Sequence, residues 1–311
     1  MTMIDHSARA HSKIGGSVVK RILRCPGSVA LCEKYPSVES EFAAEGTACH
    51  EAIDLILQNK VKNDSDVIGV TFNGIEMTEE LFVEAIVPAL EQFDKLDEEL
   101  GGIDFFNEER VEFPEIDGAF GTTDIVGTAR DRSVVLDWKF GRGVAVSAVE
   151  NEQMMYYAYA AAHTEKTKGF FAYDKPIEVF IVQPRVNDGE PFTRWMTTMP
   201  QLEAFALELK KAVALSEEPD APLALGAHCK FCQGKVGCPL YQNQVQAVGH
   251  LDPATLRAEI EQWLPWADTM IAWGNDLKQL AHDLLESGQS ITGWKLVNKR
   301  ATRKWADEEK A

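Results

Sequence analysis

The sequence lacks an apolar run long enough to cross a membrane, and residues 1–16 lack the apolar segment of a secretory signal. We therefore expect a cytoplasmic protein, in a compartment where cysteines stay reduced. The composition, 45% hydrophobic and 26% charged residues, is typical of a soluble globular protein. A length of 311 residues allows one large domain or two modest ones.

Basic residues are scarce, with 31 Lys and Arg against 49 Asp and Glu and a net charge of −18. This balance argues against a protein that coats nucleic acid nonspecifically, because such binding depends on many phosphate contacts. It does not exclude an enzyme with a local basic cleft, because net charge does not reveal how charge is distributed. The phosphate-binding loop G-x-x-x-x-G-K-[ST] is also absent.

Cysteines are few and unevenly spaced, and three of them form a C-x2-C-x5-C run at Cys229, Cys232 and Cys238. Thiolates this close in a reducing compartment favour metal binding over disulfides. A tetrahedral metal or an iron–sulfur cluster needs a fourth ligand. His228 is adjacent to Cys229 and is badly placed to bind the same ion.

The fourth ligand is therefore sought among the upstream cysteines, Cys25, Cys32 and Cys49. Cys25 precedes Pro26 in a predicted loop, and we expect it to be the most exposed. Cys32 and Cys49 lie in apolar helical segments and are expected in the core. Ligands from both ends of the chain would join the N-terminal helix to the C-terminal loop. Such a site would be structural, and zinc and an iron–sulfur cluster both remain open.

Two acids, a lysine, a glutamine and a tyrosine fall within residues 118–158, which the pattern predicts to form a β-hairpin and a helix. Asp124 lies on the first strand. Asp137 and Lys139 lie on the second, and their spacing of two directs them to the same side. The preceding residues 134–136 are apolar, as in a strand buried on both faces, where charged side chains are costly unless paired. This combination predicts a divalent-metal site.

The residue types in this hairpin suit the cleavage of a phosphodiester. Mg²⁺ prefers oxygen ligands, which Asp124 and Asp137 provide, and a bound metal polarises the phosphodiester and activates a water. Lys139 would orient that water or neutralise developing charge. Gln153 and Tyr157 are i and i+4 on the next helix, so they share a face and would line the same cleft. D-x-K by itself is common and usually marks a solvated strand end, so other parts of the chain must decide.

Elsewhere, two residues are weaker candidates for the metal site. His50 lies on a predicted helix over 41–58, four residues after Gly46, although a lone helical histidine is more typically a core or surface residue. Glu112, on a strand predicted over 108–116, would reach the metal only if it is not a surface residue. The remaining predicted elements are helices over 17–24, 78–100, 200–216 and 252–287, a hairpin turn at 73–74, strands over 177–185 and 192–199, and a strand-like piece after 290.

Four short motifs, taken in order, resemble those of RecB-type nucleases in the PD-(D/E)xK superfamily. They are Gly46-x-x-x-His50, Gly121-x-x-Asp124, Asp137-x-Lys139 and Gln153-x-x-x-Tyr157. The cysteines resemble the branch in which one upstream and three downstream thiolates hold a 4Fe–4S cluster, as in AddB and CRISPR-associated nucleases. The segments CPGSVALC, AAEGTACHEA and LDWKFGRGVAV look like phage and prophage proteins of that branch, and the resemblance covers residues 17–300.

The resemblance implies an α/β, restriction-endonuclease-like fold, with a mixed sheet flanked by helices. It assigns Mg²⁺ or Mn²⁺ to His50, Asp124 and Asp137, catalysis to Lys139 with Asp124 and Asp137, and DNA positioning to Gln153 and Tyr157. It assigns a 4Fe–4S cluster, with zinc as the alternative, to a set of four cysteines. These are Cys25, Cys229, Cys232 and Cys238.

The resemblance also implies an activity and a chain organisation. We expect an exonuclease on linear DNA, serving phage recombination or replication in the host cytoplasm, with a single-strand annealing protein or helicase as possible partner. The expected organisation is a flexible N-terminus over 1–16, a nuclease domain over 17–250 and a helical extension with a basic tail over 251–311. The alternatives are a non-catalytic DNA- or partner-binding protein with a nuclease fold, and a zinc-stabilised structural protein.

Overall fold

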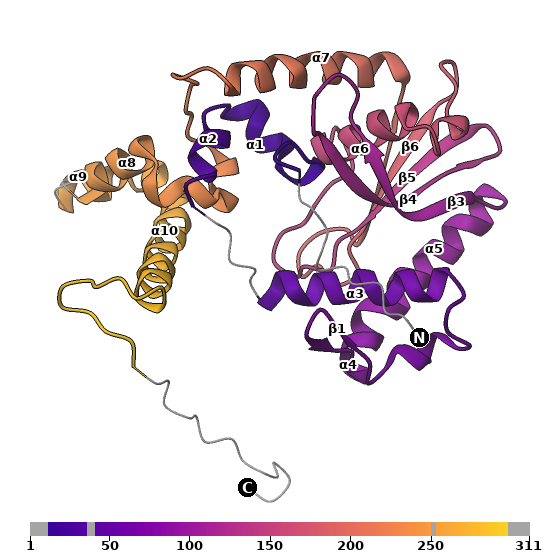
Figure 1. Cartoon of the computed structure of the whole chain (residues 1–311), viewed down its shortest axis with the longest axis horizontal. Helices are drawn as coiled ribbons and strands as arrows, with labels where there is room; N and C mark the ends of the chain where they lie inside the picture. The colour runs from indigo at the N-terminus through magenta and orange to yellow at the C-terminus, as the bar shows by residue number, and fades with distance from the viewer. Residues whose placement is uncertain (1–11, 36–40, 250–252, 298–311) are drawn as a thin grey trace, which may run out of the picture. The chain divides into compact units, whose positions relative to one another are not determined.

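The computed structural model describes residues 12–35, 41–249 and 253–297, and the chain forms two compact units, Met1–His228 and Cys229–Ala311 (Figure 1). Each unit is described by itself. Among the described helices, none combines the length and the apolar character that a membrane crossing requires. The predicted flexible N-terminus and basic tail fall largely outside the described residues, and the predicted domain boundaries stay predictions.

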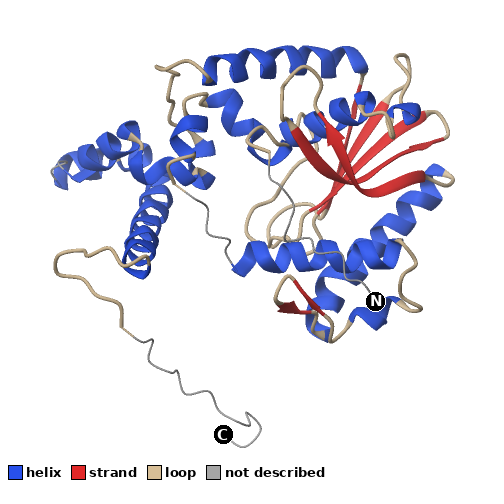
Figure 2. Cartoon of the chain, in the orientation of Figure 1, coloured by secondary structure: helices blue, strands red, loops and turns tan. Residues whose placement is uncertain are grey.

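The first unit is built on a mixed five-stranded sheet in the order β3-β4-β5-β6-β7 (Figure 2). Neighbouring strands are antiparallel except β5 and β6, which are parallel. The expected mixed sheet flanked by helices is therefore confirmed. The strands are β3 (Asp104–Glu112), β4 (Phe120–Ala129), β5 (Arg132–Trp138), β6 (Ile177–Val182) and β7 (Phe192–Thr197).

The central hairpin of β4 and β5 forms as the sequence predicted. Its turn contains Arg130 in the left-handed region, with φ of 44°, and the strands pair from Ala129↔Arg132 to Ile125↔Leu136. From Ser133 onward β5 is fully buried, because helices cover both faces of the sheet. β6 lies parallel to it and is buried along its whole length.

Helices cover the two faces of the sheet with separate apolar clusters (Figure 1). One face packs against α1 (Val19–Arg24), α6 (Glu152–His163) and α7 (Met199–Ser216). The other packs against α3 (Glu41–Leu57) and the helical segment that ends in α5 (Val87–Leu100). Alternation along the strands divides the core, since Val126 and Val135 face the first layer and Ile125 and Leu136 face the second.

The helix predicted over 78–100 is continuous but irregular. It opens as α4 (Glu79–Leu81), where the Thr78 hydroxyl accepts the Leu81 N–H at 3.1 Å. A π-helical turn, η4 (Phe82–Ile86), then precedes α5. Pro88 has no N–H and crowds the carbonyl four residues before it, which explains the wider turn at this point.

Two strand predictions need correction. The strand predicted over 108–116 occupies Asp104–Glu112 instead, because Pro114 cannot donate to a ladder and the apolar residues 105–106 extend the strand at its start. The strand-like piece after 290 forms only an isolated bridge between Ile291 and Trp294, with Gly293 turning at φ of 85°. The small hairpin at 73–74 is present, as β1 (Thr71–Phe72) and β2 (Ile75–Glu76).

The second unit is helical in its described part. The cysteine run lies on two short helical turns, η6 (Ala227–Phe231), within which the unit begins, and η7 (Gln233–Gly237). Three helices follow: α8 (Pro239–Gly249), α9 (Pro253–Ala258) and α10 (Ile260–Glu286). Lys235 is buried, donates to the Lys230 carbonyl at 2.8 Å and pairs with Asp276 of α10 at 2.8 Å. This ion pair joins the cysteine run to the long helix.

Gly121 is glycine because the Tyr157 ring lies against its backbone. A Cβ at this position would lie 2.8 Å from Tyr157 Cε1, and the ring is too buried to move away freely. We expect Gly121→Ala to lower the free energy of unfolding by about 1–3 kcal/mol, as overpacking usually does. Denaturant unfolding monitored by circular dichroism measures the change.

Gly46→Ala is the matched control, because its expected effect has the opposite sign. Gly46 lies inside α3, and a Cβ there meets no described atom within 4 Å. Alanine restricts the unfolded chain and favours the helix, so we expect a gain of about 0.5–1 kcal/mol. Equal effects of the two substitutions would contradict the contact between Gly121 and Tyr157.

Candidate active site

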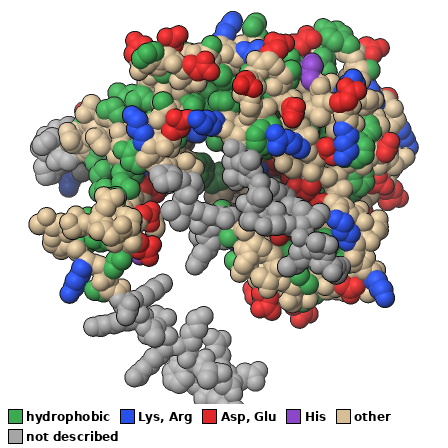
Figure 3. All heavy atoms as spheres, viewed as in Figure 1, with side chains coloured by type: hydrophobic (Ala, Val, Ile, Leu, Met, Phe, Trp, Pro, Cys, Tyr) green, Lys and Arg blue, Asp and Glu red, His purple; other side chains and the backbone are tan. Residues whose placement is uncertain are grey.

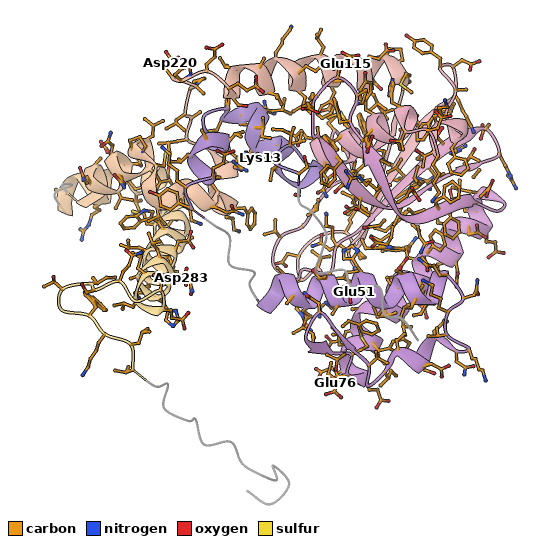
Figure 4. The ribbon with its side chains drawn as sticks, viewed as in Figure 1. Lys13, Glu51, Glu76, Glu115, Asp220 and Asp283 are labelled. Atoms are coloured by element: carbon orange, nitrogen blue, oxygen red, sulfur yellow. The ribbon has the colours of Figure 1, made fainter. Side chains whose placement is uncertain are left out.

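His50 reaches the site from α3, whose buried face holds Ala48, Cys49, Ala52 and Ile53 against the sheet. The helix continues through Glu51, whose position on α3 is labelled in Figure 4. The His50 ring meets the edge of Phe140 at 5.1 Å between centroids, with an angle of 84° between the planes. Phe140 follows β5 directly, so this contact fixes the imidazole beside the end of the central hairpin.

Asp124 joins β4 to both β5 and α3. Its Oδ2 accepts the backbone N–H of Trp138 at 2.7 Å, and its Oδ1 lies 3.3 Å from His50 Nδ1. The side chain is buried, with 8% exposure for the residue. One carboxylate oxygen is therefore held by the backbone of β5, and the other is directed to the histidine.

Glu108 also reaches this point, from the middle of β3. Its Oε1 lies 3.7 Å from His50 Nδ1, and the ladder register places it opposite Asp124. The residue adopts φ of 48°, the left-handed region that non-glycine residues rarely occupy inside a strand. Glu112, the glutamate of this strand that the sequence offered as a weaker candidate, is exposed. Alternation puts residues 108 and 112 on one face, but nothing local in the sequence signals the unusual backbone.

Asp137, Lys139, Gln153 and Tyr157 form a connected chain of polar contacts. Lys139 Nζ lies 2.7 Å from Asp137 Oδ2 and donates to Gln153 Oε1 at 3.1 Å. Gln153 Nε2 lies within hydrogen-bond distance of Asp137 Oδ1, at 3.3 Å, and of the Tyr157 hydroxyl, at 3.2 Å. Asn151 caps α6 by accepting the Gln153 N–H at 3.0 Å, so the start of this helix is fixed beside β5.

The ionisable groups of the site shift one another's pKa values. Burial lowers the pKa of His50, but the charges of Asp124, Glu108 and Asp137 outweigh it and raise that pKa above 6.5. Burial raises the pKa of Asp124, and here His50, the Trp138 N–H and Lys139 reverse the shift and lower it. Burial, together with the neighbouring Asp124, raises the pKa of Asp137 despite Lys139.

The donor set suits a divalent cation. Among the described residues, ligand atoms of His50, Glu108 and Asp124 lie within 4.8 Å of one another. Buried His50 Nδ1 and Asp137 Oδ2 have no well-aligned hydrogen-bond partner, although both lie beside ionic neighbours. An imidazole nitrogen with carboxylate oxygens is a common ligand set for Mn²⁺ and related ions. Of the predicted metal ligands, His50 and Asp124 therefore share this group, whereas Asp137 is paired with Lys139.

The surface of the first unit has no continuous positive face in the view of Figure 3, where basic and acidic side chains are interspersed. This agrees with the net charge of −18. Two basic side chains near the site are paired. Lys139 is bound to Asp137, and Arg185 Nη2 pairs with Glu45 of α3 and donates to the Phe140 carbonyl at 2.6 Å.

The predicted cluster cysteines are all buried, which corrects the expectation that Cys25 is exposed. Cys25 is 5% exposed, and its Sγ accepts the Ala224 N–H at 3.3 Å within the first unit. Cys49 is in the core as expected, and burial raises the pKa of its thiol to about 12. Cys32 is half-buried rather than in the core.

The three thiols of the second unit are not gathered as tightly as the ligands of one zinc ion. A Zn–S distance of about 2.3 Å places tetrahedral sulfurs about 4 Å apart. Among the described residues, Cys229, Cys232 and Cys238 do not form a group with all ligand atoms within 4.8 Å.

Comparison with protein families gives one match along most of the chain. The family model described as "Protein of unknown function (DUF2800)" matches residues 11–311.

Comparison with solved structures gives weak similarities. The protein SSO0001 is 13% identical, over 71% of this chain and 96% of that chain, with a TM-score of 0.30. An alkaline exonuclease, LHK-Exo from Laribacter hongkongensis, is 12% identical over 66% of this chain and 87% of that chain, with a TM-score of 0.30. The complex of LHK-Exo with dAMP is 12% identical over 64% of this chain and 90% of that chain, with a TM-score of 0.28. Similarity at this level carries no argument about the activity of this chain.

The raised pKa of His50 predicts that metal binding strengthens as pH rises. A histidine binds a metal ion only as the neutral imidazole. The acids around His50 raise its pKa, so the ring stays protonated to a pH above 6.5. Below the raised pKa we expect Mn²⁺ affinity to grow by up to about tenfold per pH unit, and above it to level off. Calorimetric titration with Mn²⁺ across this range measures the change, and an affinity independent of pH would contradict His50 as a ligand.

Proposed function

We propose that this chain, which belongs to the DUF2800 family of proteins of unknown function, is a divalent-metal-dependent deoxyribonuclease that hydrolyses linear DNA from an end. The observation behind the proposal is a convergence. Side chains from α3, β4, the end of β5 and α6 meet in one partly buried cluster that contains histidine, carboxylates and a lysine. Such a set serves metal-assisted hydrolysis and is costly to bury without a functional reason.

The residues of the site have separable roles in this proposal. His50, Asp124 and Asp137 would hold Mg²⁺ or Mn²⁺, and a bound ion would supply polarisation of the phosphodiester and a lower pKa for a bound water. Asp124 is oriented for this by the Trp138 N–H. Lys139 keeps its ammonium beside Asp137, where it orients the attacking water or neutralises charge that develops on the phosphate.

Gln153 and Tyr157 position the DNA and the lysine. The amide of Gln153 bridges Lys139, Asp137 and Tyr157, so it fixes the lysine relative to the acid. Burial raises the pKa of Tyr157 well above its usual value, which keeps the hydroxyl protonated and able to donate a hydrogen bond. The finer expectations, a phage origin, a role in recombination or replication and a single-strand annealing protein or helicase as partner, stay predictions.

Removal of the acid or the lysine should abolish cleavage. We expect Asp137→Asn and Lys139→Met each to lower the rate by at least about a hundredfold, as loss of a charged catalytic group usually does. The assay is digestion of end-labelled linear DNA and closed circular DNA with Mg²⁺ or Mn²⁺ titrated. Degradation of the linear form alone supports action from an end.

Two surface variants serve as controls. Asp131→Asn changes an exposed acid at the turn of the same hairpin, and Lys168→Met changes an exposed lysine paired with Glu165. Both should leave the rate unchanged. If the wild type binds DNA without cleaving it under either metal, the chain is a non-catalytic binding protein instead. Cleavage of the circular form would contradict the exonuclease mode.

We further propose that Cys25, Cys229, Cys232 and Cys238 bind a 4Fe–4S cluster. The spacing of the thiols in the sequence is the main support. All four thiols are buried, as ligands of a closed structural site would be. The role of the cluster is structural, since the proposed hydrolysis transfers no electrons.

The cluster should be visible after purification without oxygen. We expect a brown protein that contains iron and sulfide, and Cys25→Ala should lose most of both because a cluster ligand is missing. Cys32→Ser is the control, since Cys32 accepts a bond from Arg21 at 3.2 Å and is not a proposed ligand. A colourless protein that contains zinc would rule out the iron–sulfur assignment.

A further inference from the structure

We propose that Glu108 is a ligand of the divalent cation, together with His50 and Asp124. The inference rests on the proposed function and extends it, because the motif residues identified in the sequence do not include Glu108. Among the described residues, it is Glu108 rather than Asp137 whose carboxylate shares a 4.8 Å group with His50 and Asp124.

The distances suit three ligands on one side of an ion. His50 Nδ1 lies 3.3 Å from Asp124 Oδ1 and 3.7 Å from Glu108 Oε1. With metal–ligand bonds of about 2.0–2.1 Å in an octahedron, adjacent ligand atoms are about 3 Å apart. The three ligand atoms therefore need to move only slightly closer together to bind one ion. His50 Nδ1 is buried, has no well-aligned hydrogen-bond partner and lies beside both carboxylates.

The backbone of Glu108 departs from the regular strand around it. The β3–β4 ladder pairs Asn107 with Ile125 and Glu109 with Thr123, and it omits the intervening pair of Glu108 with Asp124. At that point Glu108 has φ of 48°. A non-glycine residue in this region costs on the order of 1–3 kcal/mol, and such residues concentrate where function requires a particular direction of the side chain.

A polar bridge from α3 holds β3 at this position. Asn107 Nδ2 donates to Asp54 Oδ1 at 2.5 Å, and Gln58 Nε2 donates to the same oxygen at 2.6 Å. Asp54 is buried and lies one helical turn after His50. The helix that supplies His50 therefore also anchors the residue before Glu108, which keeps the two candidate ligands in register.

The types of ligand determine which metal ion is best used to test the site. An imidazole nitrogen with two carboxylates favours Mn²⁺ over Mg²⁺, because Mg²⁺ prefers oxygen ligands alone. Calorimetric titration of the full chain with Mn²⁺ therefore tests the site without any need for DNA. The variants are Glu108→Gln, which keeps the size of the side chain, and Glu108→Gly, which suits the left-handed backbone and removes the carboxylate.

We expect both variants to weaken Mn²⁺ binding by about tenfold or more, which is the effect seen even for groups that only support a ligand. They should also lose most of the Mn²⁺-induced rise in Tm. Glu112→Gln is the matched control, an exposed glutamate on the same strand, and it should bind as the wild type does.

Wild-type affinity in folded Glu108→Gln and Glu108→Gly, with binding lost in Asp124→Asn, would overturn the role of Glu108 and leave the proposed nuclease intact. Loss of affinity in both variants, in a chain that cleaves no DNA, would support Glu108 as a ligand and refute the proposed function instead. Circular dichroism confirms that each variant is folded. A wild-type chain that binds no Mn²⁺ would overturn both.

Discussion

The structure depends on the burial of three carboxylates, Glu108, Asp124 and Asp137, within reach of one histidine and one lysine. Like charges repel strongly in a medium that screens them poorly, so each acid needs its own compensation. Asp124 has the Trp138 N–H and His50, and Asp137 has Lys139. The opposite pKa shifts of the two aspartates follow from these different partners. A bound cation would relieve the repulsion that remains.

The scaffold makes this burial possible because the site is built on rigid elements. β5 is covered on both faces, and the residues just beyond it supply Lys139 and Phe140. α3 and α6 approach from opposite layers of the sheet and contribute His50 and Gln153. Functional groups on such elements are held more precisely than groups on free loops.

The pattern of apolar residues in the sequence correctly predicted the elements whose formation depends on that pattern. The hairpin of β4 and β5, the helix that carries Gln153 and Tyr157 and the helix that carries His50 all form where the apolar periodicity placed them. Strand alternation predicted that Asp137 and Lys139 lie on the same side, and the structure pairs their charges. Predictions were poorest for β3, where tertiary pairing with β4 decided the bounds and the backbone at Glu108 breaks the strand pattern.

By itself, the sequence determined that a histidine, two aspartates, a lysine, a glutamine and a tyrosine lie on elements of the right type and order. Only the tertiary structure decided which of them meet. It brought Glu108 opposite Asp124, left Glu112 exposed and held Asp137 beside Lys139. The physical reason is that periodicity fixes the face on which a side chain lies. The contacts between elements distant in the chain, such as Asn107 with Asp54, depend on packing that no local window contains.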